Sequence, residues 1–187
     1  LGVKFWRGEN EQAGQFEIAR DIQESIKLQL QGLPATKIFR LEGGHGLGKT
    51  VLMAALLLYF FECFEDSVTL TTAPTLDQVK MLLWRDVRKF RSRNAPGELL
   101  PDAPEMYMDR GKHPGWMAIG RSTNNTGGQG SARAQGQHAQ YMIHLYDEAE
   151  GIPPYQFGAT DAMMTGGKVQ LWVMSANPAT QVSEFHN

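Results

Sequence analysis

The stretch that decides the fold is Gly43-Gly44-His45-Gly46-Leu47-Gly48-Lys49-Thr50. It matches the pattern G-x-x-x-x-G-K-[S/T] at every fixed position and lies between a short apolar run and a helical pattern. Glycines in such a loop let backbone N–H groups turn toward a β-phosphate, and the positive end of the following helix faces the same charge. Lys49 is expected to reach the β- and γ-phosphates, and the Thr50 hydroxyl to ligate Mg²⁺. The stretch therefore predicts a nucleotide-binding phosphate loop rather than a structural glycine turn.

The segments around this loop alternate between the patterns of helices and strands. Residues 16–30 carry apolar side chains at four-residue spacing, which is typical of a helix with one buried face. Helices are predicted over residues 16–30, 49–64 and 76–91, and strands over residues 37–41, 68–72, 116–121, 141–146 and 169–175. This order indicates an α/β protein with a mostly parallel central sheet flanked by helices. Residues 94–104 and 122–136 are rich in Pro, Gly, Asn and Ser, which favours loops.

The overall composition is that of one globular domain without a bias toward one kind of ligand. The chain has 187 residues, of which 42% are hydrophobic, and a formal net charge of -2. Any binding to nucleic acid must therefore come from a local patch. The one cysteine, Cys63, excludes a disulfide within this chain and is expected to be a small buried residue on a helix. The longest apolar stretch, residues 51–61, is too short to cross a bilayer.

Two adjacent acids follow the apolar strand predicted over residues 141–146. Asp147 is expected to hold the Mg²⁺ shell, and Glu148 to align the attacking water, because a nucleotide hydrolase needs both functions beside the phosphate loop. The alternative is a pair of acids that cap a helix. Glu150 is also near, but its spacing does not direct it to the same site. His144, inside the strand, is expected to be packed or hydrogen-bonded rather than a ligand.

A strand ending in Asp-Glu, with a further strand expected between it and the strand of the phosphate loop, resembles one division of the P-loop NTPases. This is the additional-strand, catalytic-glutamate division, which contains helicases, translocases and packaging motors. The resemblance implies its fold class, a mostly parallel central sheet flanked by helices. A small kinase fits poorly, because kinases of this class do not usually place a glutamate directly after the metal-binding aspartate.

Three further segments resemble the large terminases of tailed bacteriophages. The first segment is Thr71-Thr72-Ala73-Pro74-Thr75. The second consists of residues 135–139, before the strand that ends in Asp-Glu, and residues 149–153, after it. The third is Met174-Ser175-Ala176-Asn177-Pro178. The resemblance covers roughly residues 15–185. It implies an ATP- and Mg²⁺-dependent motor that threads double-stranded DNA into a procapsid in the host cytoplasm, with no membrane association. The implied partners are a portal protein, a small terminase subunit and further copies of the chain in a ring.

The same resemblance implies roles for residues outside the phosphate loop. Gln15 matches the glutamine that reads adenine, with Gln12 as a close rival. Asn177 matches the position that senses the γ-phosphate and couples hydrolysis to DNA movement, although Asn177-Pro178 can also be a simple turn. Some terminases carry an arginine inside the phosphate loop, and this chain has none there. Arg133 is the first candidate to supply the charge, Arg121 the second, and a solvated arginine the alternative.

Residues 84–93 are the only dense basic stretch, and they could meet DNA phosphates. The alternative is a solvated helix face whose Trp84, Val87 and Phe90 point inward.

Residues 1–187 are expected to form one ATPase motor domain, a fragment of a protein whose C-terminal nuclease domain is missing, so no nuclease activity is expected. The competing functions are a helicase-like or other nucleic-acid translocase, which would need a second ATPase lobe, and a nucleotide switch, which would not need Glu148.

Overall fold

The computed structural model describes residues 14–44, 46–123 and 139–177. The described helices are α1 (Gln15–Leu30), α2 (Lys49–Cys63), α3 (Leu76–Gln78), the π-helical turn η1 (Val79–Leu83), α4 (Trp84–Phe90), the 3₁₀ turn η2 (Ala149–Gly151) and α6 (Pro154–Met163). The described strands are β1 (Ile38–Glu42), β2 (Val68–Ala73), β3 (Glu98–Leu99), β4 (Glu105–Asp109), β5 (His113–Ser122), β6 (Tyr141–Tyr146) and β7 (Val169–Ala176). None of the described helices is long and apolar enough to cross a membrane.

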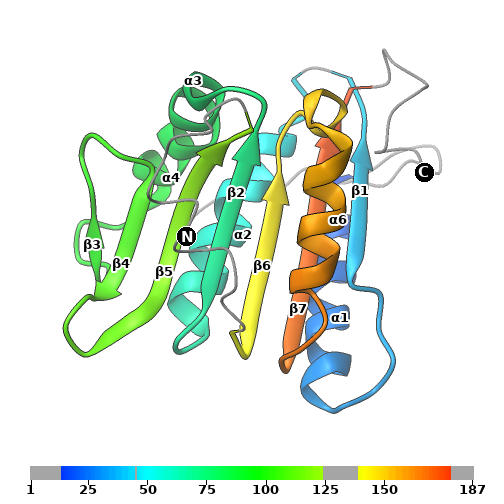
Figure 1. Cartoon of the computed structure of the whole chain (residues 1–187), viewed down its shortest axis with the longest axis horizontal. Coiled ribbons are helices and arrows are strands. Elements are labelled where there is room, and N and C mark those ends of the chain that lie inside the picture. The colour runs from blue at the N-terminus through cyan, green and yellow to red at the C-terminus, as the bar shows by residue number, and fades with distance from the viewer. Residues whose placement is uncertain (1–13, 45, 124–138, 178–187) are drawn as a thin grey trace.

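The strands form one sheet in the order β1-β7-β6-β2-β5-β4-β3 (Figure 1). The pairs β1/β7, β7/β6, β6/β2 and β2/β5 are all parallel, whereas β4 pairs antiparallel with both β5 and β3. Strand β7 therefore lies between the strand that enters the phosphate loop and the strand that ends in Asp-Glu. This confirms the prediction of an additional strand and of a mostly parallel α/β sheet.

Helices cover both faces of the sheet. In Figure 1, α6 lies over β7 on the near face, and α1, α2 and α4 lie behind the sheet. Helix α2 is almost uniformly apolar, and nine of its residues are buried. A helix that is apolar all round is stable only when it is enclosed, and α2 packs between the sheet, α1 and α4. This central helix fixes the direction of the phosphate loop, because the loop leads directly into its first turn.

Most predicted elements agree with the structure, and the differences have local causes. The helix predicted over residues 76–91 is divided into α3, η1 and α4. The predicted loop of residues 94–104 contains β3, whose two residues are too few to show an alternating pattern. Strand β4 and helix α6 were not predicted, since β4 is short and α6 begins at Pro154 and contains Gly158. Cys63 is the last residue of α2 and is exposed, so the expectation that it is buried is wrong.

Candidate functional site: the phosphate loop and the edge of the sheet

The phosphate loop connects β1 to α2 and has the backbone conformation that its glycines allow. Gly46 and Gly48 have φ values of 81° and 73°, a region that side chains with a Cβ rarely adopt. A Cβ on Gly48 would also lie 2.2 Å from Nε2 of Gln15. That nitrogen donates a hydrogen bond of 2.7 Å to the Gly48 carbonyl, so the first residue of α1 braces the loop from behind. His45 lies outside the described residues.

Lys49 is held inside the loop by three oxygen acceptors. Its Nζ donates to the carbonyl of Gly43, to the carbonyl of Gly44 at 3.0 Å and to Oδ1 of Asn177 at 2.9 Å. Burial lowers the pKa of Lys49 from its ordinary value, and the nearby carboxylates oppose this shift by favouring the charged form. The structure thus brings Lys49 and Asn177 together.

Asp147 connects the phosphate loop to β7 through its two carboxylate oxygens. Oδ2 accepts a hydrogen bond of 3.3 Å from the Thr50 hydroxyl, and Oδ1 accepts one of 2.7 Å from the Ser175 hydroxyl. Asp147 and Ser175 are 6% and 1% exposed, so the hydrogen bond between them lies in a water-poor environment where such bonds are strong. The predicted pair Thr50 and Asp147 is therefore adjacent. Ser175 was not predicted as a site residue, because its contact with Asp147 depends on the register of β6 with β7.

The chain leaves the end of β6 through an unusual backbone conformation at Glu148, which is followed by a turn that contains Glu150. Glu148 has φ 53° and ψ 52°, a left-handed conformation that costs on the order of 1 kcal/mol or more for a residue other than glycine and is concentrated at functional sites. The turn η2 that follows brings Glu150 back, so that its Oε1 accepts a hydrogen bond of 3.2 Å from the backbone N–H of Asn177. The expectation that Glu150 is not directed to this site is wrong, because spacing alone does not reveal the left-handed turn.

These residues surround a cavity of about 280 Å³ at the carboxyl edge of the parallel strands. The carboxyl edge of an open α/β sheet is where ligands bind in this kind of fold. The lining residues include the loop from Gly46 to Val51, the acids Asp147 and Glu148, the β7 end from Ser175 to Asn177, and also Arg85 and Asp86 of α4. Arg85 and Asp86 were not identified as site residues from the sequence.

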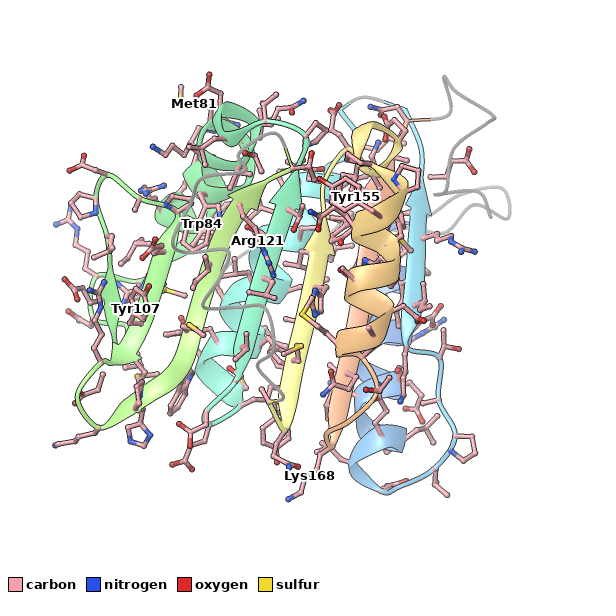
Figure 2. The ribbon with its side chains drawn as sticks, viewed as in Figure 1. Met81, Trp84, Tyr107, Arg121, Tyr155 and Lys168 are labelled. Atoms are coloured by element: carbon pink, nitrogen blue, oxygen red, sulfur yellow. The ribbon has the colours of Figure 1, made fainter. Side chains whose placement is uncertain are left out.

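The candidate arginines have different positions. Arg133 and the rival glutamine Gln12 lie outside the described residues. Arg121 lies on β5, on the sheet face that α6 covers (Figure 2), and does not line the cavity. Its Nε is buried without a hydrogen-bond partner among the described residues, and burial lowers the pKa of the guanidinium. The structure therefore does not bring Arg121 to the phosphate loop.

His144 and the basic stretch agree with their structural interpretations. His144 is 1% exposed, and its Nε2 lies 3.1 Å from the sulfur of Met142. Trp84 and Val87 are fully buried, which confirms that this side of the basic stretch points inward. Arg88 donates hydrogen bonds to the carbonyls of Leu100 and Ala103, so it fastens α4 to the next segment.

The comparisons with known proteins identify the fold. The chain matches no family model and no curated relative. Among solved structures, it is similar to the large terminase of a thermophilic bacteriophage, with a TM-score of 0.63 and 14% identity over 89% of this chain and 41% of that one. It is also similar to the large terminase ATPase domain of Thermus phage P74-26, in an arginine-to-alanine mutant, with a TM-score of 0.58 and 16% identity over 84% of this chain and 66% of that one.

A further crystal structure of the first terminase is in complex with ATP-γ-S, and this chain matches it with a TM-score of 0.55 and 13% identity over 83% of this chain and 37% of that one. The class that these comparisons show is a fold class, a mostly parallel α/β sheet in which β7 lies between the strand of the phosphate loop and the strand that ends in Asp-Glu. More particularly, the chain has the fold of the ATPase domain of phage large terminases. It spans less than half the length of the complete terminase.

Proposed function

We propose that this chain is the ATPase motor domain of a large terminase, which hydrolyses ATP to drive double-stranded DNA into a viral procapsid. The observation that carries the proposal is the meeting of Lys49, Thr50, Asp147, Glu148 and Asn177 around one cavity at the carboxyl edge of the sheet. Chain segments up to 128 residues apart in sequence supply these side chains. The fold shared with terminase ATPase domains supports the same function.

The phosphate loop would bind the triphosphate through its backbone N–H groups and Lys49. The hydroxyl of Thr50 and the carboxylate of Asp147 lie 3.3 Å apart, and they offer the oxygen ligands that Mg²⁺ prefers. These two residues would hold the ion, which neutralises phosphate charge when bound. Ser175 keeps the Asp147 carboxylate in place from the other side.

We assign the role of the base to Glu148, which lines the same cavity as Lys49 and Asp147. In the proposed step, a water oxygen attacks the γ-phosphorus while a proton of that water passes toward the Glu148 carboxylate. The bond between the γ-phosphorus and the oxygen bridging to the β-phosphate breaks, and ADP and inorganic phosphate leave. The negative charge that moves onto the bridging oxygen lies over the loop, where Lys49 can balance it.

We propose that the nucleoside of ATP binds in a different cavity from the phosphates. A second cavity of about 470 Å³ lies beside the phosphate loop, and its lining includes Gln15, Gly44 and Leu47. We place the adenine here, with Gln15 as the residue that reads it. Asn177, which contacts Lys49, would sense the γ-phosphate and transmit its loss to the end of β7.

The proposed terminase function also includes partners of the domain in DNA packaging. We propose that Arg133 of one subunit completes the site of its neighbour in a homo-oligomeric ring, since a trans-acting arginine can raise the rate ~10³-fold or more. A portal protein, a small terminase subunit and double-stranded DNA complete the assembly. Hydrolysis by the isolated chain should therefore be slow and should rise with protein concentration.

The test of the ATPase assignment compares the wild-type chain with two variants. Lys49→Ala should abolish hydrolysis, whereas Glu148→Gln should keep Mg²⁺-dependent ATP binding and hydrolyse ATP at least ~100-fold more slowly. Glu24→Gln, at an exposed position of α1, is the matched control and should have wild-type activity. Wild-type turnover by Lys49→Ala would remove the phosphate-loop assignment.

The test of the motor assignment uses a procapsid with its portal and linear double-stranded DNA. Activity should rise when these components are added, and DNA should become protected from external nuclease only in the presence of ATP. Mixing Arg133→Ala with Glu148→Gln subunits should give more activity than either alone, because some interfaces then pair an intact base with an intact arginine. The absence of both stimulation and protection would leave a P-loop ATPase with a different task.

A further inference from the structure

Arg85 is a cation of the nucleotide cavity that the proposed mechanism has not used. It lies at the second position of α4, directly after the π-helical turn η1. A π-turn inserts an extra residue into a helix and is frequently found at functional sites, because it changes the direction of the residues that follow. Arg85 and Asp86 line the same cavity as Lys49, Asp147 and Glu148.

Contacts on both sides of Arg85 hold the first turn of α4 in position, so Arg85 stays beside the cavity. Trp84, immediately before it, is fully buried, and its Nε1 donates a hydrogen bond of 2.8 Å to the Thr71 hydroxyl on β2. One turn later, Arg88 donates to the carbonyls of Leu100 and Ala103. The backbone at Arg85 is therefore held between two anchors, while its own side chain is 67% exposed.

The ionisable groups around the cavity show why a second cation is needed. Its lining includes two basic side chains, Lys49 and Arg85, and three acidic ones, Asp86, Asp147 and Glu148. A bound triphosphate adds further negative charge, of which Mg²⁺ would neutralise only part. Among the residues that the structure describes, the one ionic partner of Arg85 is Asp86, with Nε 3.6 Å from Oδ1. A guanidinium has five N–H donors, so this pair leaves capacity for phosphate oxygens.

We propose that Arg85 is a catalytic residue that contacts the terminal phosphate of ATP bound in the same subunit, with Asp86 holding the guanidinium at the cavity between turnovers. This inference rests on the proposed ATPase function and deepens it. Arg85 supplies from α4 the charge that some terminases place inside the phosphate loop. It acts within one chain, unlike the role proposed for Arg133, and it stabilises the charge that builds on the transferring phosphate.

The experiment measures kcat and nucleotide affinity for the 187-residue chain and for Arg85→Ala. We expect kcat to fall ~10²-fold or more, since the charge stabilised by an arginine builds up in the transition state. The dissociation constant for Mg²⁺·ADP should change less than ~3-fold, because ADP lacks the terminal phosphate. Tightening of ADP binding by aluminium fluoride, which mimics the transferring phosphate, should be lost in Arg85→Ala. The ratio of wild-type to variant kcat should not depend on protein concentration, as expected for a residue of the same chain.

Lys89→Ala is the matched control, because Lys89 is an exposed cation one turn further along α4 that does not line the cavity. It should keep the wild-type kcat and the aluminium fluoride effect. A wild-type kcat in Arg85→Ala, or an unchanged aluminium fluoride effect, would overturn the inference about Arg85. If Lys49→Ala also hydrolyses ATP normally, the proposed function itself fails, so the two failures are distinguishable.

Discussion

Acid should destabilise this fold through His144, and the size of the effect follows from its environment. Burial, with a smaller contribution from the charge of Arg121, lowers the pKa of His144 from 6.5 to about 3. Between these two values the unfolded chain binds a proton that the folded chain does not bind. The free energy of unfolding therefore rises with pH across this window, and the contribution of His144 is lost as the pH falls from 6.5 toward 3. One pKa unit corresponds to about 1.4 kcal/mol. Lowering the pH from 7.5 to 5 should therefore reduce the free energy of unfolding by about 2 kcal/mol through His144.

The assay is urea unfolding of the wild-type chain and of His144→Leu at pH 7.5 and pH 5. Carboxylates that titrate near pH 5 contribute to both proteins, so subtracting the two pH dependences isolates His144. The wild-type chain should lose about 2 kcal/mol more than the variant over this interval. His144→Gln, which keeps a polar side chain without a titrating group, should behave like His144→Leu in its pH dependence. If all three proteins lose the same free energy, His144 is protonated in the folded state and the reasoning fails.

Three further predictions concern the site. Ser175→Ala should lower the free energy of unfolding by about 2 kcal/mol, because it leaves a buried carboxylate oxygen without its donor at 2.7 Å. Thr50→Ala, which removes a hydrogen bond of 3.3 Å, should lower the free energy of unfolding less than Ser175→Ala does and should reduce Mg²⁺-dependent hydrolysis more. If urea unfolding and ATPase assays show the opposite ranking of the two variants, the proposed metal site is contradicted. Gln15→Ala should narrow the preference for ATP over GTP in competition binding, whereas an equal loss of affinity for both nucleotides would limit Gln15 to bracing the Gly48 carbonyl.

The sequence predicted those parts of the site that are carried by short, local patterns. The phosphate loop between β1 and α2 could be recognised because its glycines and Lys49 have fixed spacing. The acids after β6 could be recognised because an apolar strand ends directly before them. The prediction of a strand between these two needed only the resemblance to one P-loop division, and β7 occupies that place.

The parts that could not be predicted depend on irregular backbone. Glu150 reaches the N–H of Asn177 only because Glu148 is left-handed and a 3₁₀ turn follows. Arg85 reaches the cavity only after a π-helical turn, and the helical pattern of residues 76–91 gave no sign of that turn. Ser175 meets Asp147 through the side-by-side placement of β6 and β7, which are distant in sequence.

The contacts of Lys49 connect the phosphate loop to the end of β7. An ammonium group has three N–H donors, and in this structure its three acceptors are Gly43, Gly44 and the amide oxygen of Asn177. Lys49 cannot donate to β- and γ-phosphate oxygens and keep all three. In the proposed function, bound ATP would therefore replace at least one of these acceptors with phosphate, and Asn177 is the one of the three that lies outside the loop. Loss of the Asn177 acceptor would change a contact at the end of β7, at a residue whose backbone N–H donates to Glu150 in the turn after β6. By linkage, a partner whose binding displaces Asn177 from Lys49 would change the affinity for ATP by the same factor by which ATP changes the affinity for that partner.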